Sequence, residues 1–142
     1  MTELGDATPE AAAAPAAGHD DDAVALAHTL FEAAREGNTG LLQAYLDAGA
    51  PATLTNAAGD SLLMLAAYHG HADTVRLVLD HGADANAAND RGQTPLAGAA
   101  FKGYTEVART LLDAGADPDA GSPSARAAAH MFARQEILDL LG

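Results

Sequence analysis

An internal repeat constrains this chain more than any other feature of its sequence. The stretch 59–89 overlays the stretch 92–119 at a constant offset of 33. A fixed period of this length is typical of a stack of small helical units that bury their apolar faces against one another. The matched positions include Gly59 and Gly92, Leu63 and Leu96, Ala66-Ala67 and Ala99-Ala100, Gly70 and Gly103, and Leu79-Asp80 and Leu112-Asp113.

The composition narrows the class of protein further. The 142 residues suffice for one domain, carry a formal net charge of −13 and include no Cys, which excludes disulfides and Cys-based zinc sites and allows a reducing compartment. The acidity argues against nucleic acid and against anionic membrane surfaces. The Ala-rich run 11–17 is too short and too weakly apolar for a signal peptide or membrane helix. We expect a soluble, monomeric, cytoplasmic protein, and the Ala and Arg bias suggests a bacterial source.

The chain divides into two regions that differ in composition. Residues 1–20 are mostly Ala, Pro, Gly and acidic residues, so we expect a disordered tail. Residues 21–142 form the repeat domain. Its first helix is predicted to begin near Val24, with Asp21 or Asp22 as the N-cap. The apolar stripe of that helix is Leu26, Leu30 and Ala34.

The later units repeat one helix-pair pattern, with clear signals for where the helices begin and end. A second helix at about 39–48 is expected to bury Leu41, Leu42, Tyr45 and Leu46. Ser61 and Thr94 are predicted N-caps, with Pro95 at the first helical position. Asn three residues before Gly, at Asn56 and Asn89, predicts exposed hairpin-like turns between units. The expected core stripes are Val75, Val78 and Leu79, and then Val107, Ala108, Leu111 and Leu112.

The last unit departs from this plan. Predicted helices at 125–133 and 135–141 would cover the end of the stack with Ile137, Leu138, Leu140 and Leu141. Ala128-Ala129 and Leu140-Leu141 follow their counterparts at an offset of 29 instead of 33, which places a four-residue deletion in the preceding turn. The predicted units are 23–55, 56–88, 89–121 and a shortened cap at 122–142.

These residues resemble the ankyrin repeat, whose pattern is G-x-T-P-L-H-x-A-A-x-x-G-H followed by L-L-x-x-G-A-D-x-N. The resemblance covers roughly residues 24–141, and the family's His after T-P-L is replaced by Met64 and Ala97. It implies an all-α solenoid of stacked helix pairs, with about three full repeats and a capping repeat. The matching residues are Gly92-Gln93-Thr94-Pro95-Leu96, Ala99-Ala100, Gly103, Leu111-Leu112, Gly115-Ala116-Asp117, Gly70-His71, Leu79, Gly82-Ala83-Asp84 and Asn86.

The resemblance further implies a non-catalytic scaffold that binds a partner protein on the concave surface. Equivalent positions of successive repeats, which we call a slot, are expected to be neighbours in space. One such slot holds Arg35, Tyr68 and Phe101, and aromatic and Arg side chains are enriched at interface hot spots. Alternatively, the rings only cover the grooves between repeats. Carried over slot by slot, the surface holds Arg35, Glu36, Asp60, Tyr68, His69, Asp90, Arg91, Gln93, Phe101 and Lys102.

Other chemistries have little support in the sequence. The spacing of His69, His71 and Asp73 imitates a metal cluster, but His at i and i+2 do not share a helix face, so we expect no metal and no cofactor. No Ser pairs predictably with a His and a carboxylate, and no Gly-rich phosphate loop follows a strand. We therefore expect no enzyme. An inhibitor or protector of a specific enzyme remains an alternative that uses the same surface, and the acidity leaves a basic partner open.

Overall fold

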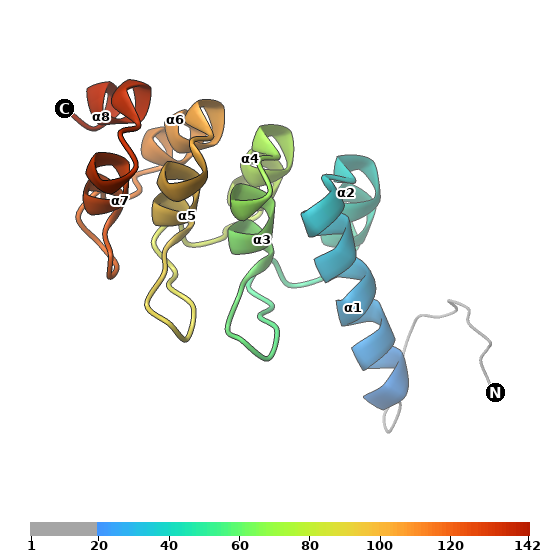
Figure 1. Ribbon diagram of the computed structural model, residues 1–142. Helices are drawn as coiled ribbons and strands as arrows, with labels where there is room; N and C mark the ends of the chain where they lie inside the picture. The colour runs from blue at the N-terminus through green and yellow to red at the C-terminus, as the bar shows by residue number, and fades with distance from the viewer. Residues whose placement is uncertain (1–19) are drawn as a thin grey trace.

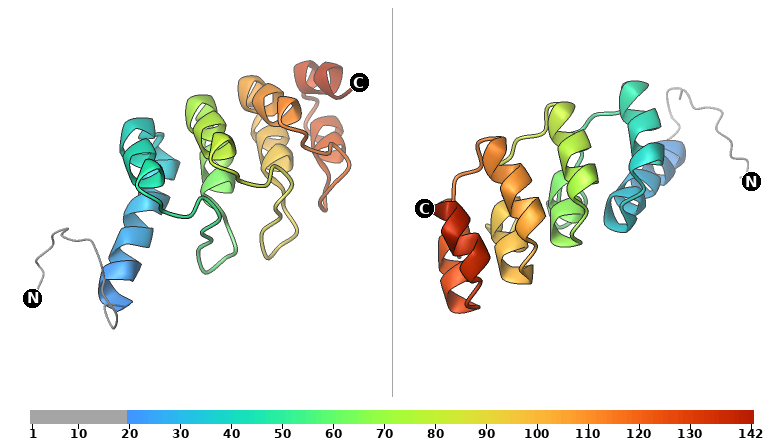
Figure 2. Two further views of the ribbon diagram at one scale, coloured as in Figure 1. Left: turned by 180° about the vertical axis from the view of Figure 1, so that it is seen from behind. Right: turned by 90° about the horizontal axis from the view of Figure 1, so that it is seen from above.

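Four helix pairs stand side by side in the computed structural model, which describes residues 20–142 (Figure 1). The predicted tail therefore lies outside the described residues, apart from Asp20. First helices pack in one row and second helices in another, and the views from behind and from above show the same order (Figure 2). The helices are α1 (Asp20–Glu36), α2 (Thr39–Asp47), α3 (Leu62–Tyr68), α4 (Ala72–Asp80), α5 (Pro95–Lys102), α6 (Thr105–Asp113), α7 (Ala125–Met131) and α8 (Gln135–Leu141).

This arrangement confirms the all-α repeat stack, since residues 20–142 contain eight helices and no strand beyond one isolated bridge. The predicted N-cap at Asp21 or Asp22 is wrong, because α1 already includes Asp20. Asp is favoured both at the N-cap and within the first turn of a helix, so a run of three Asp does not show at which residue the helix begins. No helix of this described range is both long and apolar enough to cross a membrane.

The predicted N-caps start the first helices of the middle units. The hydroxyl of Ser61 accepts a hydrogen bond from the Met64 N–H at 3.0 Å, and that of Thr94 accepts one from the Ala97 N–H at 3.1 Å. Pro95 occupies the first turn of α5, where its missing N–H costs nothing. Met64 and Ala97 stand where the family has His, and both are buried.

A repeated backbone bond closes the tight turn within each pair. The first residue after the turn donates its N–H to an Ala carbonyl five residues earlier, at 2.8–3.0 Å. The bonds join Asn38 to Ala33, His71 to Ala66, Tyr104 to Ala99 and Arg134 to Ala129. The turn residue before each donor has a positive φ: Gly37, Gly70, Gly103 and, in the last unit, Ala133.

This bond corrects the register of the last unit. Arg134 follows Tyr104 at an offset of 30, and the N-cap Ser124 follows Thr94 at the same offset. The predicted offset of 29 is therefore wrong, and three residues rather than four are missing. The error arose because the Ala-Ala and Leu-Leu pairs of the two units align with each other at 29, whereas the true offset of 30 places His130 opposite Ala100 and Gly142 opposite Leu112. The first helix of this unit also ends earlier than predicted, at Met131.

Where two apolar residues are adjacent in a second helix, one is buried in the core and the other lies nearer the surface. Val78 and Leu111 are fully buried, whereas their neighbours Leu79 and Leu112 are only partly buried and pack against the core from its edge. Successive helical residues point about 100° apart, so both leucines of a pair cannot face the same neighbour. The predicted inward position of Leu41 is wrong for the same reason: it is exposed, while Leu42 is buried. Of the other predicted core residues, Leu26 is exposed, Tyr45, Leu138 and Leu140 are partly buried, and Ile137 and Leu141 are buried.

The loops between units are closed by the predicted Asn residues. The Asn89 side-chain oxygen accepts from the N–H groups of Arg91 and Gln93, both at 3.0 Å, and Asn56 makes the equivalent pair of bonds. Adjacent loops are also joined, because the Asn89 amide donates to the Asp60 carboxylate at 2.8 Å. The loops consequently project together on one side of the helices (Figure 1).

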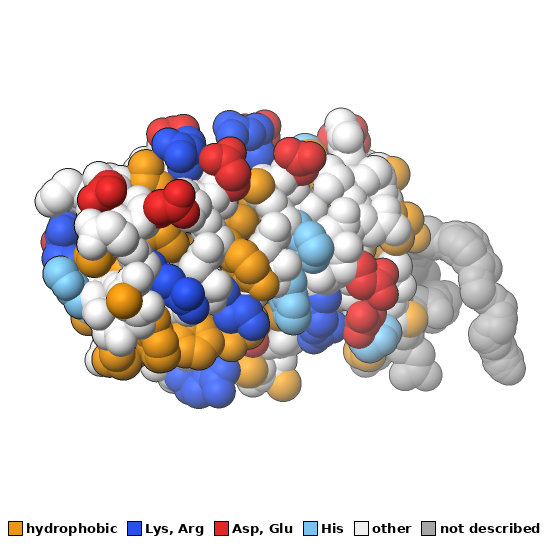
Figure 3. All heavy atoms as spheres, turned by 45° about the horizontal axis from the view of Figure 1, so that its top comes forward, with side chains coloured by type: hydrophobic (Ala, Val, Ile, Leu, Met, Phe, Trp, Pro, Cys, Tyr) orange, Lys and Arg blue, Asp and Glu red, His pale blue; other side chains and the backbone are white. Residues whose placement is uncertain are grey.

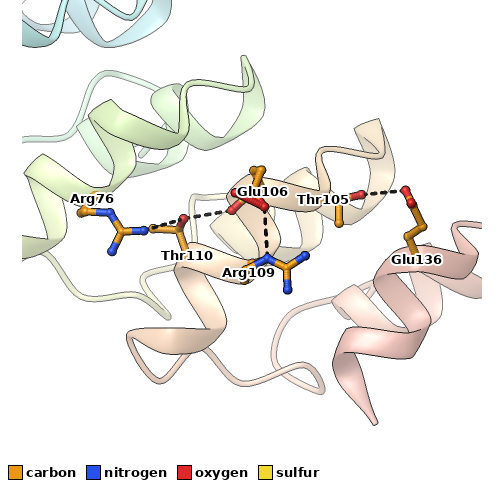
Figure 4. A network of polar contacts seen from close by, with 6 residues as sticks. All are labelled: Arg76, Thr105, Glu106, Arg109, Thr110 and Glu136. Carbon is orange, nitrogen blue, oxygen red and sulfur yellow. Dashed lines mark hydrogen bonds and ion pairs between the residues drawn. The ribbon is translucent and has the colours of Figure 1, made fainter.

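Polar contacts connect the second helices α4, α6 and α8 (Figure 4). The Arg76 guanidinium donates to the Thr110 hydroxyl at 3.4 Å, and that hydroxyl donates to the Glu106 carbonyl at 2.9 Å. Arg109 pairs with Glu106 at 3.1 Å, and Thr105 donates to Glu136 at 3.4 Å. Exposed contacts of this length add little stability, so this face is held mainly by the core beneath it.

Candidate protein-binding face

Three aromatic rings form a row across the C-terminal ends of the first helices. Tyr68 ends α3 and Phe101 lies in the last turn of α5, with parallel rings whose centroids are 6.4 Å apart. Phe132, the C-cap of α7, meets Phe101 edge to face at 4.8 Å. The aromatic patch, as we name it, consists of the two residues at the end of each of these helices: Tyr68, His69, Phe101, Lys102, Met131 and Phe132.

The patch exposes three large apolar side chains. Phe101 is 41% exposed, Phe132 42% and Met131 66%. In the described residues the other large exposed apolar side chains, Val24, Leu26 and Leu41, all belong to the first helix pair. Contiguous exposed apolar side chains rimmed by polar ones mark interaction surfaces. On the face in Figure 3, hydrophobic side chains lie among Lys and Arg, with most acidic ones along the upper part and at the right-hand end.

Tyr68 and Phe101 differ in how they are held. Tyr68 is partly buried and packs over Gly98 of the next unit, where an added Cβ would lie 3.2 Å from its ring. Tyr68 therefore covers the groove between two repeats, which is the alternative role considered for the rings in the sequence analysis. Phe101 projects further into solvent. Replacing Tyr68 would disturb packing between units, so Phe101 and Met131 are the better residues for testing binding.

Two cations border the rings. The Lys102 ammonium lies 5.0 Å from the centroid of the Tyr68 ring, within the range of a cation–π interaction. The Arg134 guanidinium donates to the Phe101 carbonyl at 2.9 Å, and its Nε is buried without a hydrogen-bond partner. Neither cation forms an ion pair with any side chain of residues 23–142. By contrast, Arg35, Arg109 and Arg126 pair with Glu32, Glu106 and Asp119 at 2.9–3.1 Å.

The histidines beside the patch are explained without a metal. The His71 ring donates its Nε2–H to the Arg35 carbonyl at 2.7 Å and so bridges two units. Burial lowers the pKa of His69 from its usual 6.5, and the nearby positive charges of His71, Arg35 and Lys102 lower it further. Both causes disfavour the charged form of His69. Among the described residues, no three His, Asp or Glu side chains converge as metal ligands would.

Of the ten residues predicted to lie on the binding surface, Glu36 is exposed at the end of α1, and the other nine fall into two groups. Tyr68, His69, Phe101 and Lys102 belong to the patch. Arg35 is partly buried and pairs with Glu32, and its charge reaches this group through its effect on the pKa of His69. The remaining four residues lie in the loops: Asp60, Asp90, Arg91 and Gln93.

The loop residues differ among themselves in how free they are to bind. Asp60 and Gln93 both accept hydrogen bonds from the Asn89 side chain, at 2.8 and 2.9 Å, and are partly buried. Their side chains therefore close the loops. Asp90 and Arg91 are exposed at the tip, so these two are the loop side chains available to a partner.

Met131 and Phe132 are patch residues that the sequence reasoning did not identify. With the corrected offset of 30, Met131 falls in the slot of Phe101, and Phe132 falls in the slot of Lys102. The incorrect offset of 29 hid this correspondence. The signal that could have revealed it is Ser124, because its N-cap role, like that of Thr94, depends on the spacing to the helix and not on the Ala and Leu pairs.

The structure is that of a helical-repeat scaffold: helix pairs joined by tight turns, loops on one side, and rings at the helix ends. The family model for ankyrin repeats in three copies matches residues 30–122. The chain therefore belongs to the ankyrin repeat family, whose members generally mediate protein–protein interactions.

A relative from Pseudomonas aeruginosa, named as an ankyrin repeat protein, is 54% identical over 41 residues, which are 29% of this chain. The matched segment spans 24% of that relative's own length. The expected bacterial character of the chain fits this relative.

Proposed function

We propose that this chain is a non-catalytic binding module whose aromatic patch contacts a partner protein. The observation that carries the proposal is the row of rings from Tyr68 through Phe101 to Phe132, in which Phe101 and Phe132 remain exposed. Exposed aromatic side chains on a rigid scaffold contribute a large share of binding energy at low entropic cost.

The module is further proposed to act as a monomer in the cytoplasm, without a cofactor. The exposed loop residues Asp90 and Arg91 would contribute at the edge of the interface, where charged groups affect association rates more than affinity. Whether binding tethers the partner, or inhibits or protects it, is a difference in consequence and not in surface. An activity assay of the co-purified partner distinguishes these outcomes.

The test compares capture of host proteins by three forms of the full chain. The patch variant carries Phe101→Ser and Met131→Ser. The control carries Leu26→Ser and Val24→Ser, because those residues are 40% and 67% exposed and match the 41% and 66% of the patch residues. Affinity for the partner should fall about 30-fold in the patch variant, corresponding to about 2 kcal/mol.

The expected result is a protein captured by the wild type and the control but lost by the patch variant, identified by mass spectrometry. Thermal melts of all three forms ensure that folding is intact. If every captured protein binds the patch variant as well as the wild type, the proposed binding face is incorrect.

A further inference from the structure

The charge beside the rings indicates what kind of partner the patch fits. The whole chain has 20 acidic and 7 basic residues, so an average part of its surface is negative. The patch is an exception, because its six residues include Lys102 and no Asp or Glu, with Arg134 beside them. A local reversal of sign in a strongly acidic protein affects which partners approach, since like charges repel and unlike charges attract.

A positive side chain in this position can act purely by stabilising the fold, and this explanation accounts for one of the two cations but not for the other. Positive side chains at helix C-termini stabilise the exposed carbonyls there, and the bond from Arg134 to the Phe101 carbonyl is explained in this way. The same explanation does not account for Lys102. Its ammonium extends over the Tyr68 ring instead of pairing with a carboxylate, and the side chain is exposed.

An unpaired ammonium beside exposed rings is suited to a carboxylate flanked by apolar groups. A cation within a partly desolvated contact gains more from an opposite charge than it would in open water. Phe101, Met131 and Phe132 provide apolar contacts within the same patch. The lowered pKa of His69 disfavours its charged form, so Lys102 is the exposed residue of the patch that carries the positive charge.

We infer that the partner docks through an acidic segment that carries at least one large apolar side chain, placed on Phe101, Met131 and Phe132 with a carboxylate at Lys102. This inference rests on the proposed function and specifies its partner. It differs from the basic partner that the net charge left open. The decisive charge is local, because screening at physiological salt limits exposed charges to a range of about 8 Å.

The test selects ligands for the full chain from a random peptide library displayed on phage. Selected peptides should combine Asp or Glu with Phe, Trp or Leu. Lys102→Glu should reduce the affinity for the selected acidic peptides about tenfold, measured by fluorescence anisotropy. The control Arg109→Glu makes the same change in net charge on the exposed surface of α6, which lies outside the patch.

Four outcomes decide between the proposals. Basic peptides, or acidic peptides indifferent to Lys102→Glu, would overturn the acidic partner. If those peptides still depend on Phe101 and Met131, the proposed function survives. Peptides indifferent to Phe101→Ser with Met131→Ser overturn both proposals. Failure to select any peptide overturns docking through a linear segment.

A final arm examines whether the chain supplies its own ligand. Residues 1–19 contain Glu3, Asp6 and Glu10, so a synthetic peptide of that sequence is added in competition with the selected peptide. Displacement would assign the patch to this segment and overturn a separate partner. Self-association of the chain that is lost with Phe101→Ser and Met131→Ser would instead identify a second copy, with the same consequence. Absence of both effects supports an acidic segment of another protein.

Discussion

Replacing Gly37 by Ala should destabilise the protein through the next repeat as well as through the backbone. Gly37 has a φ of 73°. An Ala in this left-handed region costs about 1–2 kcal/mol. In addition, a Cβ at this position would lie 2.5–2.9 Å from the His71 ring. That ring would have to move and would lose its bond to the Arg35 carbonyl, which costs about 0.5–1.5 kcal/mol more. We expect a total loss of about 2–3 kcal/mol.

Gly92 provides a matched control for the backbone part of this cost. Its φ is 78°, and a Cβ there would meet no heavy atom within 4 Å. Gly92→Ala should therefore cost only the strain of about 1–2 kcal/mol. Urea unfolding followed by circular dichroism measures both free energies, and the slopes of the unfolding curves show whether one end of the stack unfolds separately. In thermal melts each kcal/mol corresponds to roughly 4 °C.

His71→Ala completes the cycle. Once the ring is absent, Gly37→Ala should cost no more than Gly92→Ala, so the coupling between Gly37 and His71 should be about 1 kcal/mol. Equal costs for the two glycine variants would refute the reasoning. The same conclusion follows if the extra cost of Gly37→Ala persists without the His71 ring, because the close contact would then not be its source.

Three further effects follow from the packing and the charges. Leu111→Ala should cost about 2–5 kcal/mol of unfolding free energy because the residue is fully buried, and the partly buried Leu112→Ala should cost clearly less; the opposite order in urea titrations would invert the assigned core face. Ala133 has a positive φ of 55°. Ala133→Gly should therefore raise the stability by up to about 1 kcal/mol, and an unchanged melting temperature would contradict this. The pKa of His81 is raised above 6.5 by its bonds to the Leu77 carbonyl and the Asp47 carboxylate, so its stabilisation is complete below pH 6.5 and disappears as pH rises through the raised pKa. His81→Gln should abolish that dependence in urea titrations across pH values, and a dependence equal to that of the wild type would exclude His81 as its source.

Much of the fold could be predicted because its determinants act within one repeat. Ser61 and Thr94 cap their helices through the N–H three residues later, and Asn89 closes its loop through atoms two and four residues away. Such bonds depend on residue type and short spacing, which the sequence displays directly. The number of units follows from the period in the same way.

The candidate site was predictable only in part. Tyr68, Phe101 and Lys102 could be placed from the repeat slot, and the structure brings their side chains together. Met131 and Phe132 were not identified, because the last unit is shortened and its Ala and Leu pairs favour an alignment at an offset of 29 instead of 30. The turn bond from the Arg134 N–H to Ala129 selects one alignment, and this bond becomes evident only in three dimensions.

By itself, then, the sequence determined the repeat class, the helix pairs, the N-caps of the middle units and their loops, since each depends on atoms a few residues apart. The tertiary structure decided which residue of each apolar pair is buried, as with Leu111 and Leu112, because that depends on the direction of the neighbouring helix. It also decided that the charge around Phe101 is positive in an acidic protein. Lys102 lies over the Tyr68 ring and Arg134 bonds to the Phe101 carbonyl, so each contacts a residue of the preceding unit only because adjacent units stack.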